Sequence, residues 1–149
     1  MDTIAARFLL SSNDFERRLR DVRQGQWTWP TPCTEWNVRV LVNHMTRGNL
    51  NYVHLAGGGS SAEFLRLRDA DALGDDPVGA YIRSVEQRAE AFARPGVLDR
   101  LLDYPLGKLP GRQALAVRTK ARRRARPRIA SSPPPTKHRA RRGKSGYSG

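Results

Sequence analysis

Apolar residues recur at helical spacing in three stretches of this chain, with charged and polar residues on the opposite faces. The first stretch covers residues 4–22. The second begins at Asn37, a residue that can cap a helix, and continues to about residue 56, where three consecutive glycines end it. The third opens with Pro77 at the first helical position and stops at the Pro-Gly pair of residues 95–96. The pattern therefore predicts three amphipathic helices.

Three helices that each bury one face pack most simply as an antiparallel bundle. A fourth helix is expected after Gly111, but residues 113–117 supply one or two turns before the chain becomes arginine-rich. Without a fourth helix, apolar surface on the other three would face water. We therefore predict an all-α antiparallel helical bundle with three recognisable helices and the fourth missing or replaced. A second copy of the chain, in a homodimer, could cover the open face.

Charge divides the chain into two unequal parts. Residues 1–112 carry 15 of the 27 Lys and Arg and all 14 acidic residues, whereas residues 113–149 carry the other 12 basic residues and no acidic one. The second part also has too few large apolar residues to offset the entropy of ordering it. We therefore predict one helical domain at residues 1–112 and a disordered basic tail at residues 113–149.

Cysteine use and the amino-terminal sequence indicate the compartment. Cys33 is the only cysteine, which excludes an internal disulfide and fits a reducing environment. Arg7 interrupts the apolar residues 4–10, and no small-residue cleavage site follows them. We therefore expect neither a signal peptide nor a membrane span, and a cytoplasmic location.

The loop before the second helix is the most specific segment of the chain. It reads PTPCTEW over residues 30–36 and leads into VRVLVNH over residues 38–44. The prolines fix φ, so the loop reaches the helix in one direction. These two segments resemble the N-terminal domain of the mycothiol-dependent maleylpyruvate isomerase family, a branch of the DinB-like helical bundles. The likeness extends more weakly over residues 4–111 and includes the PLG turn at residues 105–107.

The resemblance implies a function for His44. In the family, the histidine at this position binds a divalent metal, usually zinc, so the expected cofactors are zinc and mycothiol. The metal would lower the pKa of the cofactor thiol and hold it as a thiolate. The thiolate would add reversibly to an activated alkene, which implies a cis-trans isomerase or a thiol transferase. The expected partners are accordingly a small-molecule thiol and an activated alkene substrate.

The remaining ligands of the family stand on its last bundle helix, where this chain carries its basic segment. A catalytic zinc commonly takes three protein ligands. His54 lies about 15 Å further along the same helix as His44, and His138 lies in the predicted tail. We therefore predict a metal-binding domain that is catalytically incomplete as written. The sudden loss of acidic residues, where a helix should begin, favours a frameshifted or truncated C-terminus.

The basic tail supports an alternative function of a different class. Basic residues without acidic neighbours bind nucleic acid through release of counterions, with no sequence preference. The alternative is thus a small nucleic-acid-associated protein that binds through this arm. The residues that would make the contacts are Arg122, Arg123, Arg124, Arg126 and Arg128.

Overall fold

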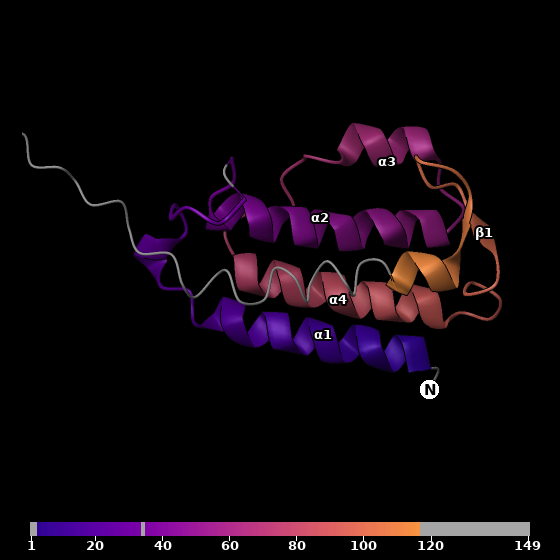
Figure 1. Ribbon diagram of the computed structural model, residues 1–149, viewed down its shortest axis with the longest axis horizontal. Coiled ribbons are helices and arrows are strands. Elements are labelled where there is room, and N and C mark those ends of the chain that lie inside the picture. The colour runs from indigo at the N-terminus through magenta and orange to yellow at the C-terminus, as the bar shows by residue number, and fades with distance from the viewer. Residues whose placement is uncertain (1–2, 34, 117–149) are drawn as a thin grey trace, which may run out of the picture.

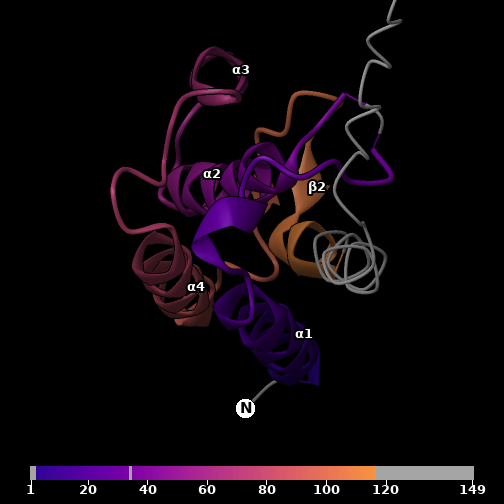
Figure 2. The ribbon, with the colours of Figure 1, turned by 90° about the vertical axis from the view of Figure 1, so that its left-hand side faces the viewer.

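The computed structural model describes residues 3–33 and 35–116, most of which are helical. The elements are α1 (Thr3–Arg20), the short 3-10 helix η1 (Gln24–Gln26), α2 (Val38–Ala56), α3 (Ser61–Leu67), α4 (Pro77–Ala93), β1 (Leu101–Leu102) and β2 (Leu109–Pro110), followed by helical residues 111–116. Helices α1, α2 and α4 form one bundle, with α3 on the outer side of α2 (Figures 1 and 2). The predicted all-α bundle is confirmed. None of the helices in the described ranges is both long and apolar enough to span a bilayer.

The helices of the bundle do not simply alternate in direction. Asn49 of α2 bonds Ser84 of α4, and Tyr52, about one turn later, packs on Arg88, about one turn after Ser84. Helices α2 and α4 therefore run parallel, whereas the contacts of α1 with α4 follow the reverse order. The antiparallel arrangement predicted from the sequence thus holds for α1 with α4 but not for α2 with α4. Residues 57–76, between α2 and α4, are long enough to cross back along α2, so α4 begins at the same end of the bundle as α2 (Figure 1).

A side chain caps the start of both α2 and α4. The side chain of Asn37 accepts a hydrogen bond from the Val40 amide at 2.9 Å and begins α2. Asp76 accepts from the Gly79 amide at 3.0 Å, and Pro77 opens α4. Each cap satisfies an amide that the helix itself leaves without a partner. The predicted starts of these two helices are therefore confirmed.

Each long helix buries the apolar face that its sequence predicted. Phe8, Phe15 and Leu19 of α1 are fully buried against the apolar faces of the other helices. On α2 the buried positions include Val42 and Met45, which follow the same helical spacing. These faces form one continuous core.

Two features between and after the long helices were not predicted. The sequence predicted no helix between residues 56 and 77, but this segment contains α3, which Ser60 caps by accepting from the Glu63 amide at 3.3 Å. Phe64 of α3 packs edge-on against Tyr52 and Tyr104. The second feature is the two-stranded hairpin of β1 and β2, whose strands are only two residues long.

Helical structure continues to residue 116, four residues past the boundary that the sequence placed at 112. Ala114 and Leu115 are buried in the core, and Arg88 donates to the carbonyl of Ala114 at 3.2 Å. Gly111 begins this helix where a Cβ would collide with the carbonyl of Val97. Residues 113–116 therefore belong to the folded body. The rest of the predicted tail lies outside the described residues.

Candidate functional site

An open cleft of about 270 Å³ lies along the first half of α2. One wall comes from α2 and the loop before it, and the other comes from residues 68–71, which follow α3. The lining residues are Trp36, Arg39, Val40, Asn43, His44, Arg68, Asp69 and Asp71. The cleft therefore combines an aromatic wall with charged groups of both signs.

The proline-bounded loop places Trp36 on His44. The hydroxyl of Thr31 donates to the carbonyl of Trp36 at 2.8 Å, and the amide of Thr31 donates to the same carbonyl at 3.2 Å. The amide of Val38 in turn donates to the Trp29 carbonyl at 3.0 Å. The Trp36 indole then lies 4.8 Å from the half-buried imidazole of His44, tilted by 43°. The loop thus fixes the aromatic wall of the cleft.

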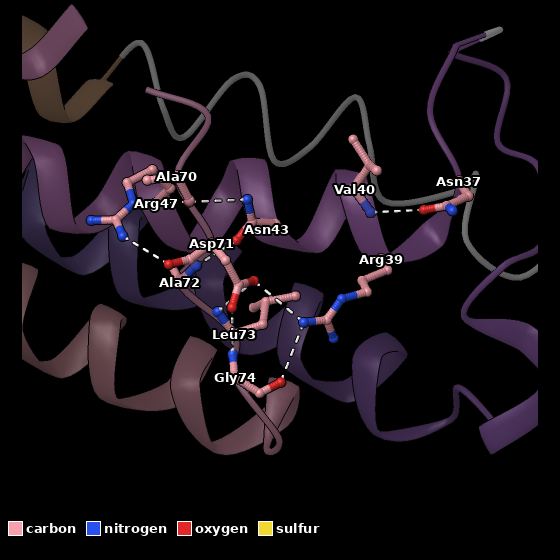
Figure 3. A network of polar contacts seen from close by, with 10 residues as sticks. All are labelled: Asn37, Arg39, Val40, Asn43, Arg47, Ala70, Asp71, Ala72, Leu73 and Gly74. Carbon is pink, nitrogen blue, oxygen red and sulfur yellow. Dashed lines mark hydrogen bonds and ion pairs between the residues drawn. The ribbon is translucent and has the colours of Figure 1, made fainter. Parts of the chain in front are cut away.

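The opposite wall belongs to the segment of residues 68–74, which we name the strap. Arg39, Asn43 and Arg47 stand at four-residue steps along α2 and all point toward the strap (Figure 3). Asn43 accepts from the Ala72 amide at 2.8 Å and donates to the Ala70 carbonyl at 3.3 Å. These three side chains were not predicted from the sequence. A polar row at four-residue steps on an amphipathic helix was the available signal.

The two arginines bind the strap through its carbonyl groups. Arg47 donates to the carbonyls of Ala70 and Asp71, at 3.2 and 3.0 Å. Arg39 donates to the carbonyl of Gly74 at 3.2 Å and to the Asp71 carboxylate at 3.3 Å. The arginines therefore recognise the path of the strap backbone rather than its side chains alone.

The carboxylate of Asp71 is engaged within the strap. It accepts from the Gly74 amide at 3.1 Å and from the Leu73 amide at 3.4 Å. These two backbone amides, and then the charges of Arg39 and Arg47, hold the pKa of Asp71 below its ordinary value of 3.8. Asp71 is therefore an ionised group that shapes the strap.

The described residues do not fit the metal centre that the family resemblance implied. Within residues 3–33 and 35–116, no three His, Cys, Asp or Glu side chains come together in a way that could hold an ion. His44 shares the cleft with Asp69 and Asp71, but the Asp71 carboxylate already accepts two amides and the Arg39 guanidinium. A catalytic zinc commonly needs three protein ligands. Nothing in the described structure completes a centre around His44.

Of the other histidines and the arginines considered for nucleic-acid binding, only His54 lies in the described part of the chain. His54 lies near the end of α2 and pairs with Glu63 of α3, away from the cleft residues. His138 lies outside the described residues. So do the residues proposed to bind nucleic acid, Arg122, Arg123, Arg124, Arg126 and Arg128.

Comparison with known proteins decides the family. The family model for the mycothiol maleylpyruvate isomerase N-terminal domain matches residues 8–143. The chain belongs to this family. Membership supports the DinB-like interpretation of the bundle, and the matched range continues beyond residue 112 into the basic segment. The matched range therefore extends further than the motifs that first indicated the family. The frameshift expected at the C-terminus stays a prediction.

Two curated relatives that the chain matches have names that state no activity. Two uncharacterized proteins, from the CDC 1551 and H37Rv strains of Mycobacterium tuberculosis, are each 30% identical to this chain over 105 residues. The aligned region covers 70% of this chain and 53% of each relative, so the chain spans about half the length of the curated relatives it matches. No solved structure matches the chain significantly.

Proposed function

We propose that this domain binds a small-molecule thiol of the mycothiol type in the cleft beside His44, and that it is catalytically incomplete by itself. Family membership supports the class of ligand. The observation that supports the place is the contact of the Trp36 indole with the His44 imidazole, whose ring centroids lie 4.8 Å apart, in a cleft that Asn43 also lines. An apolar wall with a few fixed polar groups is typical of small-molecule sites.

Support for catalytic incompleteness comes from the possible ligands in the described part of the chain, residues 3–33 and 35–116. In this family the metal would lower the pKa of the cofactor thiol, so that the thiol is ionised near neutral pH. That chemistry would need a complete ligand set around the ion. Here His44 retains the family's histidine position, while Asp71 is committed to the strap. Metal binding through His44, with zinc as the expected ion, therefore stays a prediction that calls for ligands beyond the described residues.

Titration of mycothiol into the full chain, followed by amide and indole NMR signals, tests the ligand proposal. Signals from Trp36 and Asn43 are expected to shift together, and Trp36→Leu should abolish the shift of the Asn43 signal. Arg17→Met is a suitable control because Arg17 lies on α1 and is not a cleft residue. Shifts that are absent, or that gather away from the cleft, would overturn the proposal.

Two further assays test incompleteness. With zinc, mycothiol and maleylpyruvate present, the full chain is expected to give no isomerisation above the uncatalysed rate. In competition with a chromogenic chelator, zinc is expected to bind weakly. Tight binding that both His44→Ala and His138→Ala abolish would contradict the proposal, because residues outside the described ranges would then complete a family-type centre.

The nucleic-acid alternative and the homodimer remain proposals of lower rank, since no contact in the described residues favours either. Binding to duplex DNA that weakens steeply with salt is expected of any such basic segment. Neutralising Arg122, Arg123 and Arg124 would have to change a cellular phenotype before that binding counted as function. Sedimentation of the full chain tests the homodimer.

A further inference from the structure

The strap is attached to the bundle by polar contacts and by one apolar side chain, that of Leu73, which packs in the core. Leu73 is its one fully buried residue, and the strap itself contains neither helix nor strand. The remaining attachments are the hydrogen bonds and the ion pair from Arg39, Asn43 and Arg47 on α2 (Figure 3). Regions with few buried apolar groups and exposed hydrogen bonds open at lower free energy than the core.

Both ends of the strap permit it to move without unfolding the bundle. Before it lies α3, which has no buried residue. The strap ends at Gly74, whose φ of +56° is in the left-handed region that favours glycine. The next residues lead to the Asp76 cap of α4, which does not depend on the strap contacts. Opening of the strap would therefore leave α2 and α4 in place.

Movement of the strap would change the cleft directly. Arg68, Asp69 and Asp71 lie on the strap, whereas Trp36 and His44 lie on α2 and its preceding loop. The two groups of residues form opposite walls of the same cleft. When the strap separates from α2, the wall formed by the strap residues moves away, whereas the wall formed by Trp36 and His44 keeps its position.

We propose that the strap opens as a unit, independently of the bundle, and controls access to the cleft beside His44. Arg39, Asn43 and Arg47 are the positioning residues that hold it closed. This proposal depends on the proposed function in one respect only, namely that the cleft binds a ligand. Opening and access can both be measured without ligand, so failure of one proposal is distinguishable from failure of the other.

Hydrogen exchange of the full chain tests the opening. The amide of Ala72 donates to Asn43 of α2 and reports on separation of the strap from α2, whereas the amide of Gly74 donates to Asp71 and reports on order within the strap. They are expected to exchange through an opening that is insensitive to denaturant, and Arg47→Met should accelerate them about tenfold while α4 amides are unchanged. Asn43→Ala is a second variant with the same expectation. Strap amides that exchange only with global unfolding, at the rate of the slowest α4 amides, would overturn the proposal.

Chemical modification of histidine tests access. Diethylpyrocarbonate reacts with exposed imidazoles, and peptide mapping separates the products at His44 and His54. Arg47→Met is expected to raise the reaction rate at His44 several-fold and to leave His54 unchanged, because His54 pairs with Glu63 outside the strap. Arg17→Met, on the surface of α1, serves as the matched control. An unchanged His44 rate in a variant with faster strap exchange would show that the strap does not control the cleft.

Discussion

Two arginine-centred networks join segments of this domain, one inside the core and one on its surface. Arg88 of α4 is fully buried, whereas Arg39 and Arg47 of α2 are partly exposed. Both networks direct guanidinium groups at backbone carbonyls of a segment distant in sequence. The two networks therefore share guanidinium-to-carbonyl hydrogen bonds and differ in their exposure to water.

Burial changes the role of the interior network. The Arg88 guanidinium lies 4.4 Å from the Tyr52 ring and donates to Asn49 at 3.2 Å and to the Ala114 carbonyl at 3.2 Å. The rings of Phe8 and Phe92 flank it at 5.0 and 5.6 Å. Cation-π contacts and hydrogen bonds both strengthen where water is excluded. Arg88 thus connects α2, α4 and residues 111–116 at the cost of desolvating its charge.

Solvent makes the surface network weaker and reversible. Each hydrogen bond from Arg47 or Asn43 to the strap competes with a bond to water, so its net contribution is small. The exposed ion pair of Arg39 with Asp71 is also screened by salt. The comparison indicates that one arginine maintains the fold, while the other two set the position of a movable wall.

Replacing Arg88 is expected to have the largest effect. Arg88→Met removes the donors to Asn49 and Ala114 and leaves those acceptors in a dry core. Urea denaturation of the full chain should show a loss of about 3 kcal/mol in the free energy of unfolding. Arg17→Met, at a side chain that is 77% exposed, should change it by less than about 0.5 kcal/mol. An equal response of the two variants would refute a central role for Arg88.

The start of the last described helix provides the next test of the interior network. Gly111→Ala would force a Cβ against the Val97 carbonyl and displace the helix that carries Ala114, the acceptor for Arg88. We expect a loss of about 1–3 kcal/mol in the free energy of unfolding, measured by the same denaturation. Gly25→Ala is the matched control, since a Cβ there meets open space. Equal stability of the Gly111 and Gly25 variants would contradict this close packing.

Sequence patterns predicted the elements whose stability comes from an apolar stripe. The α2 helix was predicted from Asn37 onward because its cap and its buried positions follow one another directly in the sequence. The α3 helix was missed because it is seven residues long and buries none of them. Its Ser60 cap, with Glu63 three residues later, was the local signal that was available.

The site was predicted in part, for a physical reason. The proline-bounded motif predicted the loop that places Trp36 against His44. The strap was not predicted, because Arg39 and Arg47 reach it across 23 to 35 residues and bind mainly carbonyls, which every residue has. Nor did the pattern place Arg88 inside, since charged residues of amphipathic helices normally face solvent.

Arg47→Met makes the same arginine-to-methionine change in the surface network that Arg88→Met makes in the core. It removes the donors to the Ala70 and Asp71 carbonyls, which water can replace. We expect a loss below about 1 kcal/mol in the global free energy of unfolding, because only the strap loses contacts. Thermal and urea denaturation of both arginine variants, side by side, measures the difference. A loss as large as that of Arg88→Met would place the strap within the cooperative core.

Acid is expected to have the smallest effect and to act on the surface network alone. The amides of Gly74 and Leu73 hold the pKa of Asp71 below 3.8 in the folded chain. A carboxyl with a lowered pKa stabilises the folded form above its unfolded pKa, and this contribution disappears as pH falls through the folded value. NMR signals of both amides should therefore titrate together below about pH 4, and Asp71→Asn should remove the titration. If α4 amides titrated with them, acid would be acting on the bundle, and the two networks would not be separable.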